Sequence, residues 1–149
     1  MKKIYFHELN ISSSLLHKRD LKQFLLSVFE KEKKKITRVD IIFCKDKYLL
    51  SLNKKFLNHN YNTDTLSFLL SKTKEPIRGE LYLSVDRIKV NARVFNIPYQ
   101  NELLRVVIHS CLHLCGYLDS SKTAAKKMET LQEAYLKKWN VSRETQIGR

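Results

Sequence analysis

Apolar and polar residues alternate with a period of two in several short segments of the chain, which is the pattern of half-buried strands. In one of these segments Val39, Ile41 and Phe43 would share a single face. Polar loops at 58–63 and 72–79 separate the later segments. The pattern predicts four strands, at residues 2–9, 36–44, 65–70 and 80–85.

Other segments repeat apolar residues every three or four positions, which is typical of amphipathic helices. Residues 15–34 carry such a stripe, with Leu21, Leu25 and Val28 among its members. Aspartate and asparagine are favoured where a helix begins, so Asp46, Asp86 and Asn101 mark helix starts. The predicted helices are 15–34, one opening at Asp46, one from Asp86 to about residue 95, one from Asn101 to Gly116, and one from 121 to about 139.

These elements fit one α+β domain of about four strands and five helices, spanning residues 1–149. The chain is 149 residues long and 43% hydrophobic, which is enough to bury a core without disulfides. No repeat, low-complexity tract or linker divides it. Residues 140–149 are polar and are expected to form a loose tail.

The cysteine content and the first residues indicate the compartment. Three cysteines without a framework spacing argue against a disulfide scaffold and favour a reducing, cytoplasmic location. The chain begins with two lysines after Met1, but the apolar run that follows is only three residues long. We therefore expect no signal peptide. No stretch approaches a membrane span, and we expect no membrane partner.

The chain is strongly basic. It has 28 lysines and arginines against 15 acidic residues, which gives a formal net charge of +13. Clustered basic residues bind nucleic acid by releasing the counterions that surround its phosphates. The charge therefore favours RNA or DNA as a partner.

The segment from His109 to Asp119 has the spacing of a metal site. Two histidines at i and i+4 share one helix face, about 400° of rotation apart at roughly 100° per residue. Gly116 stands where a left-handed residue ends the helix, and the reversal that it permits would return Asp119 to the same ion. Two imidazoles and one carboxylate with an open position are typical of catalytic zinc.

Two other interpretations compete with this site. The histidines could be a hydrogen-bonded pair in an apolar helix. If the segment were a strand, His109, Cys111, His113 and Cys115 would form a row of four ligands. Apolar residues recur at helical spacing up to Gly116, and this favours the helix. On a helix the two cysteines lie about 200° from the histidine face and would be small buried residues.

With these residues in view, the chain resembles the YbeY family of bacterial endoribonucleases, the rRNA maturation factors. The family motif H-G-x-L-H-L-x-G-Y-D-H stands here as residues 109–119, HSCLHLCGYLD. A block like L-N, an aromatic residue and T-D-V-L-S-F appears as Leu52-Asn53, Phe56 and residues 63–68, TDTLSF. A block like G-D-I-x-I-S appears as residues 79–84, GELYLS. The three blocks keep the family's order.

The resemblance implies a small mixed β-sheet flanked by helices, with a zincin-like metal helix. It implies one Zn2+, or another divalent ion, held by His109, His113 and Asp119, where Asp119 stands in place of the family's third histidine. The implied activity is hydrolysis of single-stranded RNA in small-subunit rRNA end maturation and ribosome quality control. Precursor rRNA is the implied partner, with ribosomal proteins as further partners.

This chain departs from the family pattern at three positions. Asp119 lowers the net charge of the metal site by one, which makes a bound water less acidic and favours harder ions. Ser110 replaces a glycine. The family's arginine in the L-N block, proposed to contact phosphate, aligns with Leu57. The candidates for replacing its charge are Lys54, Lys55 and Arg78.

Two alternative functions follow from the same residues. A zinc peptidase of the metzincin kind has similar histidine spacing, but it needs a glutamate as general base where this chain has Ser110. A non-catalytic ribosome-assembly factor, which binds RNA and uses the metal to brace its fold, is favoured by Leu57. Ligand variants that lose cleavage but keep RNA binding would separate the nuclease from the assembly factor.

Overall fold

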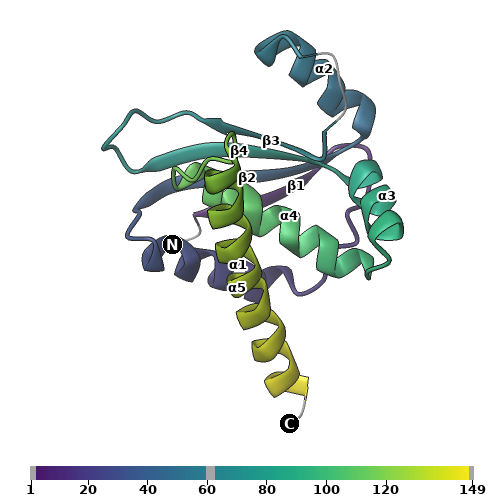
Figure 1. Ribbon diagram of the computed structural model, residues 1–149, viewed down its shortest axis with the longest axis vertical. Coiled ribbons are helices and arrows are strands. Elements are labelled where there is room, and N and C mark those ends of the chain that lie inside the picture. The colour runs from purple at the N-terminus through teal and green to yellow at the C-terminus, as the bar shows by residue number, and fades with distance from the viewer. Residues whose placement is uncertain (1–2, 60–62, 148–149) are drawn as a thin grey trace.

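The computed structural model describes residues 3–59 and 63–147, which form a mixed sheet with helices on both faces (Figure 1). The strands lie in the order β1-β2-β4-β3. β1, β2 and β4 are parallel, and β3 is an antiparallel edge strand. The strands are β1 (Ile4–Glu8), β2 (Ile36–Cys44), β3 (Thr65–Leu69) and β4 (Ile77–Ser84). The helices are α1 (Lys18–Lys31), α2 (Asp46–Leu57), α3 (Val85–Phe95), α4 (Tyr99–Leu114) and α5 (Lys122–Ile147).

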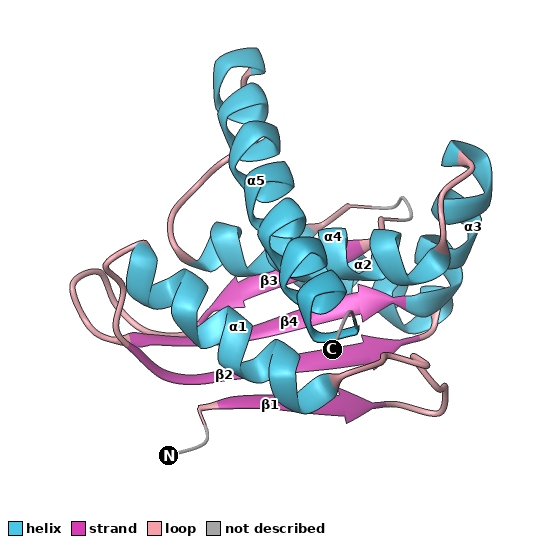
Figure 2. Cartoon of the chain, turned by 90° about the horizontal axis from the view of Figure 1, so that it is seen from below, coloured by secondary structure: helices cyan, strands magenta, loops and turns pink. Residues whose placement is uncertain are grey.

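The main core fills the space between the sheet and α1 and α4. Leu81 and Leu83 of β4 point into it, together with Val107 and Cys111 of α4. α5 packs against α4, and α1 crosses the strands on this side of the sheet (Figure 2). The predicted α+β fold with a small mixed sheet is confirmed.

α2 covers the opposite face of the sheet. Leu49 of α2 packs with Leu66 in a smaller cluster, against which Phe68 and Tyr82 also pack. Side chains of β4 alternate between the two faces of the sheet. Gly79, Leu81 and Leu83 are buried on the α4 side, whereas Tyr82 lies on the α2 side. Residues on α2 and residues on α4 therefore lie on opposite sides of the sheet (Figure 1).

The capping residues of three helices differ from the sequence prediction. The carboxylate of Asp86 accepts the backbone N–H of Asp46 at 2.8 Å, so Asp86 caps α2 rather than its own helix. The hydroxyl of Ser84 caps α3 by accepting from Arg87 N–H. α4 begins at Tyr99, directly after Pro98, and not at Asn101. A proline fixes the backbone angle that suits a helix entry, and this effect prevails over the capping tendency of asparagine.

Element lengths also differ, and α1 covers only Lys18–Lys31 of the predicted 15–34. β4 begins at Ile77, three residues earlier than predicted, because Ile77 and Gly79 pair with β2. The expected loose tail at 140–149 is wrong up to Ile147, since α5 continues to that residue. Arg143 helps to hold these turns, because its guanidinium binds the carboxylate of Asp20 at 2.5 Å and lies over the Trp139 ring. In the described part of the chain, no helix is long and apolar enough to cross a bilayer.

Candidate metal centre

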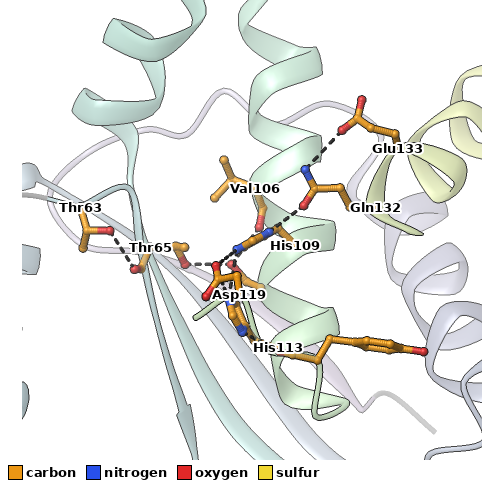
Figure 3. A network of polar contacts seen from close by, with 10 residues as sticks. Thr63, Thr65, Val106, His109, His113, Asp119, Gln132 and Glu133 are labelled. Carbon is orange, nitrogen blue, oxygen red and sulfur yellow. Dashed lines mark hydrogen bonds and ion pairs between the residues drawn. The ribbon is translucent and has the colours of Figure 1, made fainter. Parts of the chain in front are cut away.

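Helix α4 presents His109 and His113 on a partly buried face beside α5 (Figure 3). The opposite side of α4 is apolar and packs into the core. The two histidines are one helical turn apart, and their Nε2 atoms lie 3.0 Å from each other. The i, i+4 spacing therefore brings both imidazoles to one point, as the sequence predicts.

The chain reverses just after α4, and the reversal brings Asp119 back to the histidines. Gly116 has φ of 105°, a conformation that side chains rarely adopt. Its N–H binds the carbonyl of His113, and the N–H of Tyr117 binds the carbonyl of Leu112, which together close the helix end. One carboxylate oxygen of Asp119 lies 3.4 Å from the Nε2 atom of each histidine. The three predicted residues are thus brought together.

Hydrogen bonds at the far side of each ring fix the histidine tautomers. His109 Nδ1 lies 2.6 Å from the amide oxygen of Gln132, and His113 Nδ1 lies 2.9 Å from the Tyr117 carbonyl oxygen. The Gln132 amide nitrogen donates to Glu133, which sets the direction of the amide. Because carbonyl oxygens only accept, each Nδ1 carries the proton and each Nε2 keeps a lone pair.

This donor set fits a metal ion. Two lone pairs 3.0 Å apart repel each other, and a cation between them removes that repulsion. Donor atoms separated by about 3 to 3.5 Å match a four-coordinate zinc, whose bonds to nitrogen and oxygen are about 2 Å long. Burial, together with the neighbouring His109, lowers the pKa of His113 and so favours the neutral form that binds metal.

We call His109, His113 and Asp119 the metal group. Ser110 lies between the two histidines in the sequence, but its side chain faces β3 instead of this group. Its side chain is fully buried, and its hydroxyl donates to the Val106 carbonyl at 2.8 Å. It accepts from the Thr65 hydroxyl, also at 2.8 Å, which holds the start of β3 against α4. A hydroxyl in this position cannot act as the general base that a zinc peptidase requires.

The cysteines of the motif lie on the other side of α4. Cys111 and Cys115 are buried in the core, and their segment is helical up to Leu114, so the row of four ligands does not form. Burial raises the pKa of the Cys111 thiol and raises that of Cys115 to about 12. The prediction that both are small buried residues is confirmed.

Comparison with known proteins decides the family. A family model described as "Endoribonuclease YbeY" matches residues 7–140. The chain belongs to this family. An "Endoribonuclease YbeY" from Cytophaga hutchinsonii is 35% identical over 133 residues, which cover 89% of this chain and 93% of the relative. Another from Flavobacterium psychrophilum is 41% identical over 115 residues, which cover 77% and 81%.

A solved structure agrees with this result. The solution structure of TM1509 from Thermotoga maritima superposes with a TM-score of 0.64 at 30% sequence identity, over 93% of each chain. The sequence resemblance to the YbeY family is confirmed, and with it the expectation that the chain belongs to a family of nucleases.

In this YbeY family member the three candidate RNA contacts lie away from the metal group. Lys54 and Lys55 are exposed on α2, on the far face of the sheet. Arg78 points to that same far face, because its neighbour Gly79 faces Leu114 of α4 and side chains alternate along a strand.

The hollow that adjoins the metal group is acidic. It has a volume of about 450 Å³, and it is lined by Glu102, Glu129 and Glu133 as well as Asp119. Arg105 lies among them and binds Glu102 at 2.7 Å and Glu133 at 2.8 Å. A cation is favoured here, whereas a phosphate group meets several negative charges.

Two polar residues near the metal group were missed by sequence reasoning. Gln132 orients His109 from α5, and no local pattern indicates a contact across 23 residues. Asp64 stands just before β3, and burial raises the pKa of its carboxyl while the nearby His109 opposes the rise. A signal for Asp64 was present, since it belongs to the TDTLSF block that carried the family resemblance.

Proposed function

We propose that this protein is a metal-dependent endoribonuclease that cuts single-stranded RNA. The observation that carries the proposal is the donor set, in which His109, His113 and Asp119 converge. Both histidines donate their Nδ1 protons to other acceptors, so each Nε2 is available for a metal. The names of its YbeY relatives support RNA cleavage as the activity. Two imidazoles and one carboxylate leave a coordination position open, as in catalytic zinc sites.

His109, His113 and Asp119 would hold one divalent ion per chain, and we expect zinc. A bound ion of this kind polarises a phosphoryl oxygen and lowers the pKa of a bound water. Gln132 and the Tyr117 carbonyl keep both imidazoles in the tautomer that presents Nε2. Because Asp119 is a charged oxygen donor, the site also suits harder ions such as Mn2+.

We further propose that the RNA is precursor ribosomal RNA, in the maturation of its small-subunit end and in ribosome quality control. The support is the match of the three motif blocks to the YbeY pattern and the net charge of +13. Ribosomal proteins are proposed as further partners and the cytoplasm as the location. Lys54, Lys55 and Arg78 stay candidates for contacts with RNA distant from the cleavage site.

The second candidate function is a non-catalytic RNA-binding assembly factor with a structural metal. It is favoured by Leu57, which is 43% exposed where the family has an arginine, and by the acidic hollow beside the metal group. A zinc peptidase is disfavoured because Ser110 is buried against Thr65.

A cleavage assay with a ligand variant tests the proposal. The zinc-loaded protein and His113→Ala are incubated with a short single-stranded RNA and with a duplex of the same sequence. We expect the wild type to cut the single strand, chelation to stop it, and His113→Ala to be inactive while its circular dichroism and RNA affinity stay unchanged. A wild type that binds RNA but never cuts it, with any of several divalent ions, replaces the nuclease by the assembly factor.

A further inference from the structure

A second hollow is lined by residues 114–116, between His113 and Asp119, and it is strongly basic. Its volume is about 620 Å³, and it is formed by the α1–β2 connection, the β3–β4 hairpin and the end of α4 at Gly116. Both loops lie at the same end of the sheet (Figure 2). Its cations, which we call the lysine groove, are the exposed side chains of Lys33, Lys34, Lys35, Lys72 and Lys74.

One carboxylate also lines the groove, that of Glu75. It is already engaged, because it accepts the backbone N–H of Lys72 at 2.7 Å. Five ammonium groups around one hollow repel one another, so a polyanion binds favourably there, because it neutralises them and releases the cations around its own phosphates. The groove thus differs in the sign of its charge from the acidic hollow that His109 and Asp119 line.

Two of these lysines occupy backbone positions that suit lysine poorly. Lys33 has φ of 59° and Lys74 has φ of 74°, in the left-handed region that glycine and asparagine favour. Lys33 ends α1 in the same way that Gly116 ends α4, since the N–H of Lys34 binds the carbonyl of Phe29. The corresponding residues after α2 and α3 are Asn58 and Asn96. A glycine at either position would be less strained but would carry no charge.

Two structural connections link the groove to the metal group. Glu32, the residue before Lys33, accepts the hydroxyl of Tyr117 at 2.5 Å, and Tyr117 is two residues from Asp119. The free edge strand β3 runs from Thr65, which binds Ser110, to Leu69 at the groove, about 13 Å at roughly 3.3 Å per residue. An extended RNA strand of a few nucleotides covers such a distance.

We propose that the lysine groove binds the phosphate backbone of single-stranded RNA on one side of the cleaved bond, so that the strand enters along β3 toward the metal group. The proposal rests on the proposed nuclease function, which supplies the RNA. The acidic hollow sets the direction, because phosphates are attracted to the groove and repelled beyond His109. This assigns to the groove the contact that Leu57 cannot make.

The test compares two double variants by fluorescence anisotropy with a labelled, uncleavable 2′-O-methyl single strand. Lys72→Ala/Lys74→Ala removes two groove cations. Lys45→Ala/Lys47→Ala has the same spacing and charge loss, but it lies at the opposite end of β2. Each phosphate contact on a single strand contributes about 0.7 to the log–log salt slope, or about fivefold in affinity at 0.1 M salt. We expect the groove variant to bind about 25-fold more weakly with a slope smaller by about 1.4, and the control to bind within about twofold of wild type.

Lys33→Gly provides an independent test in a protein that should be more stable. It removes one charge and relieves the left-handed strain, so we expect the Tm to rise by about 2 to 4 °C while RNA binding weakens about fivefold. Equal losses in the groove and control variants overturn the proposal, and so does a groove variant that binds like wild type. If that variant also cuts unmodified RNA normally, only the groove proposal fails, whereas a wild type that neither binds nor cuts RNA refutes the nuclease as well.

Discussion

Gln132 is the residue whose removal tests the metal geometry most directly. Its amide oxygen accepts the Nδ1 proton of His109 at 2.6 Å and so holds the ring with Nε2 toward Asp119 and His113. Gln132→Met keeps the length of the side chain but removes the acceptor. His109 is then free to rotate or to move its proton to Nε2, and either change weakens metal binding.

The expected loss follows from how exposed the histidine is. Removing a partner of this kind typically costs 10- to 100-fold in metal affinity, or about 1.4 to 2.8 kcal/mol. The His109 side chain is 24% exposed, so water can partly replace the amide oxygen. We therefore expect the lower end of the range, a loss of about tenfold in zinc affinity.

Zinc affinity is measured by competition with a chromophoric chelator, and circular dichroism checks the fold. Gln132→Glu restores an acceptor and should bind zinc at least as tightly as wild type. Gln23→Met, an exposed position on α1, is the matched control and should have no effect. Wild-type affinity in a folded Gln132→Met would refute the reasoning that this hydrogen bond sets the tautomer.

Three further predictions concern the ligands and the thiols. Metal analysis of His113→Ala should show a clear loss of bound metal. Cys111→Ser and Cys115→Ser should keep the metal, but each should lose about 1 to 3 kcal/mol of stability because it buries a hydroxyl. Loss of metal in either folded serine variant would show that the cysteines are ligands. Asp119→Ala should abolish metal-dependent cleavage in a gel assay while RNA binding in the lysine groove persists, and a variant that cuts normally would remove Asp119 from the site. Burial raises the pKa of the Cys44 and Cys115 thiols to about 12, so their contribution to stability is present below the unfolded-state pKa of about 8.5 and is lost as the pH rises toward 12. Chemical denaturation at a series of alkaline pH values measures this loss, and Cys44→Ala should reduce it.

The ligand geometry could be predicted from the sequence because it is local. His109 and His113 are one turn apart on a single helix, and Gly116 permits the reversal that returns Asp119 within three residues. Each step depends on helix periodicity or on one backbone conformation, and both can be read from residue types. The same holds for Cys111, which helix periodicity alone places on the buried side.

Features that depend on packing between distant elements could not be predicted. The contact of Gln132 with His109 requires the position of α5 against α4. Asp86 caps α2 instead of α3 because the two helix starts lie side by side, which no local pattern indicates. Strand β4 starts early because its first residues pair with β2. Tertiary contacts decided each of these cases against a local preference.

The net charge shows most clearly what a sequence sum leaves out. A net charge of +13 predicts that the chain attracts polyanions, but it does not indicate which part of the surface binds them. In the structure the two hollows at the metal-binding segment have opposite signs, with carboxylates beside His109 and lysines beside Gly116. Three of the groove lysines lie in one run of sequence, and the other two come from the β3–β4 hairpin. Only the fold brings them together.

The proposed metal-dependent nuclease requires this separation of charge. Lysines next to the metal group would attract phosphate but would also repel the cation, and Asp119 with the nearby carboxylates does the opposite. The five groove lysines are exposed to solvent, so salt at physiological ionic strength screens their repulsion of a bound cation. In the proposed arrangement the RNA backbone would span the length of β3, about 13 Å, between the lysine groove and the metal group. We therefore expect Lys33 and Lys74 to add to RNA affinity with little effect on the binding of the ion.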